Sequence, residues 1–286
     1  MPTRIVVRLT AIVAGSLALL NGCGSGAPDP DADVAARDAL GHVHGLGIDP
    51  ADGTLYAASH FGVFRLAEGR PPERVADRWQ DTMAFTVVGP NRFLGSGHPD
   101  LREDLPVHLG LIESTDAART WSAISLQGGA DFHALEATSE VIVGYDSLSG
   151  QLLASADGRD WRSVAKADLV DLAMNPSQSS TVLATTPQGS IVEYQLDGGE
   201  PQQIAGTPPL VFIDWPEPDL LVGLAPDGAV YLSADGARGW RRTEQPPGDP
   251  QAVDVAPGAW NVATSQGVFQ STDDGRTWSL LAQSAD

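Results

Sequence analysis

Near its C-terminus the chain reads Ser271-Thr272-Asp273-Asp274-Gly275-Arg276-Thr277-Trp278. This order of residues predicts a β-hairpin corner, because an aspartate side chain accepts hydrogen bonds from turn amides and glycine adopts positive φ at no steric cost. The tryptophan that ends the segment is suited to packing between sheets. The segment therefore predicts a connection between two strands of an all-β fold.

Three other segments repeat this pattern of serine, aspartate and tryptophan. Ser114 to Trp121 lacks only the glycine, Ser233 to Trp240 is looser, and Ser155 to Trp161 is one residue shorter, so its turn must be tighter. Recurrence of one hairpin along a chain indicates a repeat architecture. We assign a structural role in these turns to Asp116, Trp121, Asp157, Trp161, Asp235, Trp240, Asp273 and Trp278.

Alternating apolar residues divide the rest of the chain into units of roughly forty residues, which is the length of a four-stranded propeller blade. Strands are expected at 44–48, 54–59 and 63–66 in the first unit and at 252–256, 260–264 and 268–271 in the last. The sequence therefore predicts an all-β fold, a β-propeller of about six four-stranded blades, as a single domain over residues 41–286. The units begin near His42, Asp81, Asp131, Leu169, Leu210 and Ala252.

The N-terminus has the pattern of an export leader. Arg4 and Arg8 flank a short apolar run that ends at Leu20-Asn21-Gly22-Cys23 and resembles a lipobox. The run is too short for a stable membrane span. We expect a lipoprotein signal peptide over residues 1–23, lipidation of Cys23, and a flexible tether over residues 24–40. The protein would then be membrane-anchored through its lipid, on the outward-facing, extracytoplasmic side of the cell membrane.

The charge of the chain restricts its partners. The formal net charge is −20, and Lys166 is the only lysine. Such a surface repels phosphates and anionic headgroups, which argues against nucleic acid as a partner. Because the chain has one cysteine, it forms no internal disulfide.

The four hairpin motifs match the Asp-box pattern, and the whole chain after the leader resembles bacterial Asp-box (BNR repeat) lipoproteins, the sortilin-like or glycosyl-hydrolase-like β-propeller family. The opening His42-Val43-His44-Gly45-Leu46 strengthens this resemblance. The resemblance implies a propeller with Asp-box hairpins. Members of this superfamily range from sialidases to non-catalytic binding proteins, so the resemblance leaves the activity open. The first and fourth units lack a recognisable Asp box.

Polar side chains gather at one end of the predicted central channel. In a propeller, the start of each innermost strand and the end of the next strand meet on one face beside the channel. The innermost strands align His44, Met83 and His133 with Asp171, Phe212 and Asp254. Two residues earlier, on the same strand face, lie His42, Asp81 and Asp131. The second strands of the first three units end at His60, His98 and Asp146.

Imidazoles and carboxylates at this density suit a divalent transition metal, and a nearby thioether favours copper. Zinc stays open, because three imidazoles and a carboxylate also satisfy a tetrahedral ion. The predicted metal ligands are His42, His44, His60, Met83, His98, Asp131, His133 and Asp146. The alternative is a hydrogen-bonded polar plug without metal. His108 falls outside this set, in an insertion between Gly97 and Leu109 that could fold over the mouth.

Three functions remain open. The first is a binding protein for a metal, a glycan or another small ligand, without catalysis. The second is a glycoside hydrolase, which needs two facing carboxylates, here from among Asp81, Asp131, Asp146, Asp171 and Asp254. The third is a protein-assembly scaffold, for which the sequence identifies no protein partner. Sialidase activity is disfavoured, because none of the following arginines falls at a strand end beside the channel: Arg65, Arg119, Arg159, Arg238 and Arg276.

Overall fold

The computed structural model describes residues 40–284, in which every regular element is a β-strand. This confirms the all-β prediction. The predicted signal peptide, the lipidation of Cys23 and the tether up to residue 39 lie outside the described residues. Leu40, the last residue of the predicted tether, is fully buried. Within the described part of the chain, no helix is long and apolar enough to cross a membrane.

The strands form six antiparallel sheets of four, each composed of consecutive strands. Blades one and two contain β1 (Val43–Ile48), β2 (Leu55–Ser59), β3 (Gly62–Leu66), β4 (Glu73–Arg74), β5 (Asp81–Gly89), β6 (Arg92–His98), β7 (Leu111–Ser114) and β8 (Ser122–Ser125). Blades three and four contain β9 (Phe132–Ala137), β10 (Ile142–Asp146), β11 (Gln151–Ser155), β12 (Arg162–Lys166), β13 (Leu172–Met174), β14 (Thr181–Thr185), β15 (Ile191–Gln195) and β16 (Gln202–Gln203). Blades five and six contain β17 (Phe212–Glu217), β18 (Leu220–Leu224), β19 (Val230–Ser233), β20 (Arg241–Arg242), β21 (Pro250–Ala256), β22 (Ala259–Thr264), β23 (Gly267–Ser271) and β24 (Ser279–Gln283).

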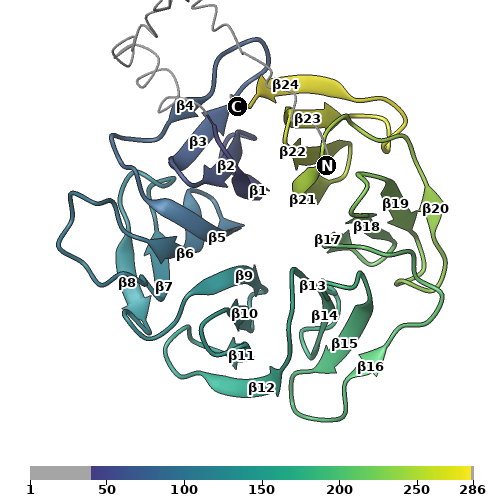
Figure 1. Ribbon diagram of the computed structural model, residues 1–286, viewed down its shortest axis with the longest axis horizontal. Coiled ribbons are helices and arrows are strands. Elements are labelled where there is room, and N and C mark those ends of the chain that lie inside the picture. The colour runs from purple at the N-terminus through teal and green to yellow at the C-terminus, as the bar shows by residue number, and fades with distance from the viewer. Residues whose placement is uncertain (1–39, 285–286) are drawn as a thin grey trace, which may run out of the picture.

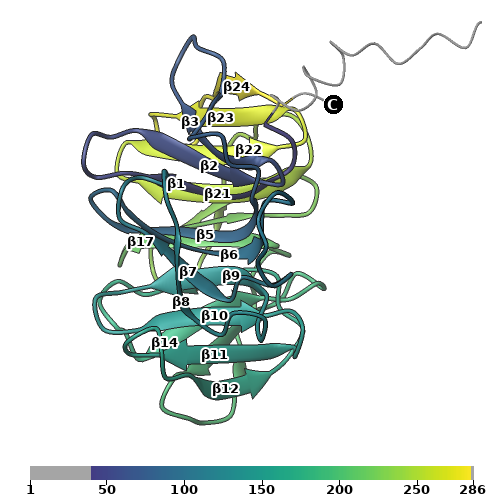
Figure 2. The same ribbon diagram turned by 90° about the vertical axis from the view of Figure 1, so that its left-hand side faces the viewer.

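The six sheets stand around a central axis as a six-bladed β-propeller (Figure 1). The first strand of each sheet lies innermost and the fourth lies at the rim. Seen from the side, the strands of blade three lie side by side (Figure 2). Because neighbouring strands are antiparallel, the starts of the first strands and the ends of the second strands share one face. The connection between the second and third strands of each blade lies on the same face.

The core lies between the blades. Six apolar clusters are buried, and each combines residues of two neighbouring blades. The cluster that closes the ring joins Leu46 of blade one to Ala263 of blade six. Gly45 allows close packing of neighbouring blades, because a Cβ on this residue would lie 3.0 Å from Cβ of Phe85 in blade two. Burial of these clusters is the main stabilising contribution to the ring.

The hairpin corners carry the hydrogen bonds that the motifs suggest. In the β23–β24 turn, Asp273 accepts a hydrogen bond from the amide of Thr277 at 2.9 Å. In the shorter β11–β12 turn, Asp157 accepts one from Asp160, a residue closer in sequence, also at 2.9 Å. These turns join the third and fourth strands, on the face opposite the starts of the innermost strands. The aspartates that bond to turn amides are Asp116, Asp157, Asp235 and Asp273.

The tryptophans at the ends of these turns contact the preceding blade. The indole N–H of Trp161 donates to Ser125 Oγ at 2.9 Å, and its ring lies 5.0 Å from that of Phe132. The indole N–H of Trp278 donates to the carbonyl of Glu244 at 3.0 Å. Each turn therefore joins two neighbouring blades as well as two strands.

Candidate metal centre at the channel mouth

β-Bulges orient the side chains at the channel mouth. The β1–β2 register shifts between Val43 and Gly45, which leaves His44 as the extra residue. Comparable shifts leave Met83 extra in β5 and His133 extra in β9. A bulge bends the strand and redirects one side chain. The three residues that the sequence aligns therefore share one place in the fold.

The alignment of the last blade was wrong. The bulge in β21 contains Gln251, while Asp254 pairs with Asn261 farther along the strand. Gln251 therefore occupies the place that corresponds to His44. Its side-chain oxygen accepts a hydrogen bond from the Val43 amide at 3.0 Å, so it helps to close the ring between the last blade and the first. The sequence alignment missed Gln251 because it placed Asp254, three residues later in the chain, at this position.

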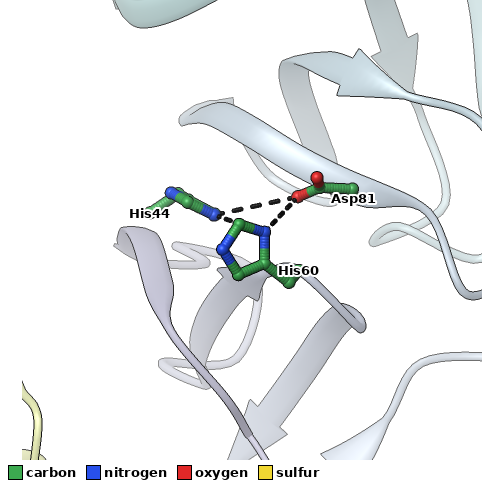
Figure 3. Close-up of side chains that lie close together, drawn as sticks. All are labelled: His44, His60 and Asp81. Atoms are coloured by element: carbon green, nitrogen blue, oxygen red, sulfur yellow. Dashed lines mark hydrogen bonds and ion pairs between the residues drawn. The ribbon is translucent and has the colours of Figure 1, made fainter. Parts of the chain in front are cut away.

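Three side chains from two blades form the first triad, which we define as His44, His60 and Asp81 (Figure 3). His44 belongs to β1, His60 follows β2, and Asp81 begins β5. Nδ1 of His60 lies 3.1 Å from Nε2 of His44 and 2.9 Å from Oδ1 of Asp81. Nε2 of His44 lies 3.7 Å from the same carboxylate oxygen.

His44 is prepared to act as a neutral ligand. Burial, together with the neighbouring imidazoles of His60 and His42, lowers the pKa of His44 to about 3. Burial also lowers the pKa of His42, whose ring centre lies 4.9 Å from that of His44. Since a metal binds the unprotonated nitrogen of imidazole, these two side chains need not release a proton at neutral pH.

A second triad, which we define as His98, His108 and Asp131, lies at the junction of blades two and three. His98 ends β6, His108 lies in the β6–β7 connection, and Asp131 immediately precedes β9. Oδ2 of Asp131 lies 3.7 Å from Nε2 of His98 and 3.6 Å from Nδ1 of His108. Nε2 of His133 lies 3.1 Å from the same carboxylate oxygen.

Two polar atoms of the second triad are buried without a hydrogen-bond partner in residues 40–284. Within residues 40–284, Nδ1 of His108 and Oδ1 of Asp131 lack a hydrogen-bond partner although neither atom is exposed. The Asp131 side chain is only 6% exposed. Burial alone would raise the pKa of Asp131, but the hydrogen bond from His133 and the nearby imidazoles hold it below its usual range. Unpaired buried polar atoms are costly, and a cation held between His98, His108 and Asp131 would satisfy Nδ1 of His108.

The separations within both triads fit a small metal ion. In a tetrahedral site with bonds of 2.0 to 2.1 Å, neighbouring ligand atoms lie about 3.3 Å apart. The separations are 2.9, 3.1 and 3.7 Å in the first triad, and 3.6 and 3.7 Å from Asp131 in the second. Each triad offers two imidazoles and one carboxylate. An ion in either would keep a position open for water or another ligand.

The insertion after β6 brings His108 to the mouth. Arg102 in this insertion contacts Asp100 at 2.6 Å and Asp77 at 2.9 Å. Arg78, in the segment before β5, and Glu103, in the insertion, form a second ion pair at 2.7 Å. These contacts fasten the insertion to the segment before β5. His108 was left out of the predicted ligand set, because it lies in the inserted connection and not at a strand start or end that recurs in each blade.

Four of the predicted ligands lie outside both triads, although His42 lies beside His44 of the first and His133 beside Asp131 of the second. Among the residues that the structure describes, the groups of histidines and carboxylates that could hold an ion do not include Asp146. The Asp146 carboxylate accepts hydrogen bonds from the amides of Asp131, Leu148 and Ser149, so it stabilises the turn after β10. Asp81, which the sequence places in the cluster but not among the predicted ligands, belongs to the first triad.

Below the mouth, carboxylates line the channel, a cavity of about 530 Å³ that also includes His44 and His133 in its wall. Asp171 accepts a hydrogen bond from the amide of Ile213 in the next blade at 2.9 Å. Asp214 repeats this contact with the amide of Val255, at 2.5 Å. The carboxylates thus fasten successive innermost strands to one another. The channel carboxylates are Glu136, Asp171, Asp214 and Asp254.

Burial raises the pKa of every carboxyl group in this channel set. The pKa of Asp171 rises to about 7. The pKa values of Asp214 and Glu136 rise because both are buried and because the channel carboxylates repel one another. Part of this set therefore holds protons at neutral pH. The sequence identified Asp171 and Asp254 as channel residues and missed Asp214.

Comparisons with known proteins support the fold. No family model and no curated protein matches the chain. A structure of YCF48 bound to a D1 peptide is similar, with a TM-score of 0.52 and 15% identity over 84% of this chain and 82% of the other. A chain of a nidogen–laminin complex has a TM-score of 0.60 and 12% identity over 77% and 89%. An ancestral GH74 enzyme has a TM-score of 0.51 and 16% identity over 87% of this chain and 39% of its own. At these identities the similarity establishes the β-propeller fold alone.

Proposed function

We propose that this protein is a lipid-anchored, extracytoplasmic binding protein that holds a transition-metal ion at the mouth of its propeller channel. The observation that carries the proposal is the second triad, where a buried carboxylate oxygen and a buried imidazole nitrogen have no hydrogen-bond partner within residues 40–284. A polar plug would be expected to satisfy such atoms within the protein. A metal ion in the second triad would satisfy the imidazole nitrogen.

Copper(II) is the favoured ion and zinc(II) is second. For a given set of nitrogen and oxygen ligands, the affinity of divalent first-row metals peaks at copper. Imidazole and carboxylate also suit zinc. Selection between copper and zinc would therefore depend on the coordination geometry of the site and on which ion is available. Met83, on the neighbouring bulge, would supply a thioether for copper(I) if its side chain turned toward the mouth.

The test is metal retention by the full-length protein, purified in detergent without an affinity tag and stripped with a chelator. Stoichiometric copper or zinc after dialysis, measured by elemental analysis, supports the proposal. Asp131→Asn should lose the ion that the second triad holds. Asp160→Asn, which changes a carboxylate in a turn on the opposite face, should keep it. Failure of the unmodified protein to retain either metal would exclude this function.

The membrane location has its own test. Support for it comes from the apolar run that ends at Cys23, with Arg4 and Arg8 flanking it. Incorporation of a labelled fatty acid into the full chain, abolished in Cys23→Ser and retained in Ser25→Ala, is the expected result. Labelling that persists in Cys23→Ser would reject lipidation at this residue.

A glycoside hydrolase is the second candidate. The observation that favours it is the channel wall, where burial raises the pKa of Asp171 to about 7, because a general acid for glycoside cleavage must hold its proton at neutral pH. One protein of similar fold is a GH74 enzyme. Hydrolysis of soluble oligosaccharides that is lost in Asp171→Asn would support this function. In the described part of the chain, no observation favours the scaffold interpretation over these two.

A further inference from the structure

The two triads follow one plan in successive blades. In the first, His60 at the end of one blade's second strand faces Asp81 at the start of the next blade's first strand, at 2.9 Å. In the second, His98 and Asp131 occupy the corresponding places, with His98 Nε2 3.7 Å from the carboxylate. The propeller repeat has therefore produced two equivalent pairs of ligands at neighbouring blade junctions.

The third ligand has a different origin in each triad. The first triad takes it from the bulge in β1, where His44 points to the mouth. The corresponding bulge in β5 contains Met83, and the second triad instead takes His108 from the inserted connection. Both triads thereby reach the same composition, two imidazoles and one carboxylate, by separate routes.

We infer that the mouth holds two metal ions, one in each triad, and that binding at the two is coupled. This inference rests on the proposed metal-binding function and adds a second ion to it. An ion with bonds of about 2.1 Å reaches ligand atoms no more than about 4.2 Å apart. The ligand atoms form two separate groups, each within 4.8 Å, and do not merge into one. One ion therefore cannot serve both triads.

Asp81 and His98 connect the two ions. Oδ1 of Asp81 belongs to the first triad, while its Oδ2 lies 3.3 Å from Nδ1 of His98. When Nε2 of His98 binds an ion, Nδ1 carries the proton and donates a hydrogen bond to Oδ2 of Asp81. Such a carboxylate–imidazole–metal arrangement fixes the orientation of both groups and raises the basicity of the imidazole.

This hydrogen bond predicts that an ion in the second triad strengthens binding of an ion in the first. By thermodynamic linkage, an ion in the first triad strengthens binding in the second by the same factor. An ion in the second triad orients Asp81 toward His44 and His60, so it prepares the first triad. Loss of the Asp81 carboxylate removes a ligand from the first triad and the hydrogen-bond acceptor from the second. Loss of such an acceptor commonly weakens metal binding by about 10- to 100-fold.

The experiment is a zinc titration of the chelator-stripped, full-length protein in detergent, by equilibrium dialysis with elemental analysis. The unmodified protein should bind two ions, and His60→Gln and His98→Gln should each bind one. Asp81→Asn should also bind one, about 10- to 100-fold more weakly than the ion that His60→Gln retains. Asp160→Asn is the matched carboxylate control and should bind two. Thermal unfolding of each stripped variant verifies that it remains folded.

The outcomes separate the inference from the proposed function. One ion in the unmodified protein, lost in both His60→Gln and His98→Gln, would overturn the two-ion inference and leave metal binding intact. Absence of any bound ion would overturn both. Two ions in the unmodified protein, together with an ion of unchanged affinity in Asp81→Asn, would overturn the coupling. Cobalt(II) absorption in the two histidine variants should differ, because the two triads have different surroundings.

Discussion

Nδ1 of His108 lies 3.6 Å from Oδ2 of Asp131, although the first residue belongs to an inserted connection of blade two and the second to the start of blade three. The contact spans a blade junction and depends on how the insertion is held. It therefore links metal binding at the second triad to the order of the insertion.

Excess zinc should stabilise the protein against unfolding. An ion present at one hundred times its dissociation constant adds about 2.7 kcal/mol to the free energy of unfolding if it binds only the folded state. His108→Ala should lose the part of this gain that comes from the ion in the second triad and keep the part that comes from the first triad, at the same zinc concentration. Chemical denaturation with and without zinc measures it. An equal gain in His108→Ala would show that His108 is not a ligand.

Arg102→Ala should weaken zinc binding at the second triad by about 3- to 10-fold. The guanidinium contacts Asp100 and Asp77, and without them the insertion must become ordered when the ion binds. Arg92→Ala is the matched control, because it removes an exposed ion pair with Glu113 outside the insertion. Equal affinities in the two variants would contradict the positioning role of Arg102. Competition with a chromogenic chelator measures the affinity.

The stability of the propeller should fall as the pH rises through 7. Burial raises the pKa of Asp171 to about 7, above its value in the unfolded chain. The folded state then binds more protons than the unfolded state between these two pKa values. The stabilisation is complete below the unfolded pKa and is lost as pH rises through the folded one. Glu136, Asp214 and Asp254 act in the same direction.

Asp171→Asn should flatten this dependence, because an asparagine oxygen still accepts the Ile213 amide but carries no charge. Denaturation of the chelator-stripped protein at pH 5 and pH 8 measures the effect. We expect the variant to gain stability relative to the unmodified protein at both values, and to gain more at pH 8 than at pH 5. A gain of the same size at both values would point to a cause other than ionisation.

Gly275→Ala should destabilise the last hairpin corner more than Gly258→Ala does. Both glycines have positive φ, 74° and 76°, so each substitution carries a backbone strain of about 1 kcal/mol or more. Only Gly275 is enclosed: an added Cβ would lie 2.8 Å from Trp260, whereas Gly258 has open space. Overpacking adds about 1 to 3 kcal/mol. Equal changes in the free energy of unfolding would contradict this account.

The parts of the fold that the sequence alone determined are those that depend on interactions between residues close together in the chain. The Ser-x-Asp turns bond within themselves, and period-two alternation defines a strand without distant information. The number of blades and the first three strands of the first and last blades followed from these patterns, with strand limits correct to within two residues. The gathering of imidazoles on one face was also predictable, because antiparallel order brings the starts and ends of the inner strands together.

Only the tertiary structure decided how those side chains are grouped. β-Bulges place His44 and His133, and ion pairs across a blade junction bring in His108, which no repeat pattern includes. The Asp146 carboxylate is instead engaged by backbone amides. A shift of a single residue in register redirects a side chain, and such shifts depend on long-range packing, so the sequence predicted a polar mouth while the fold divided it into two triads.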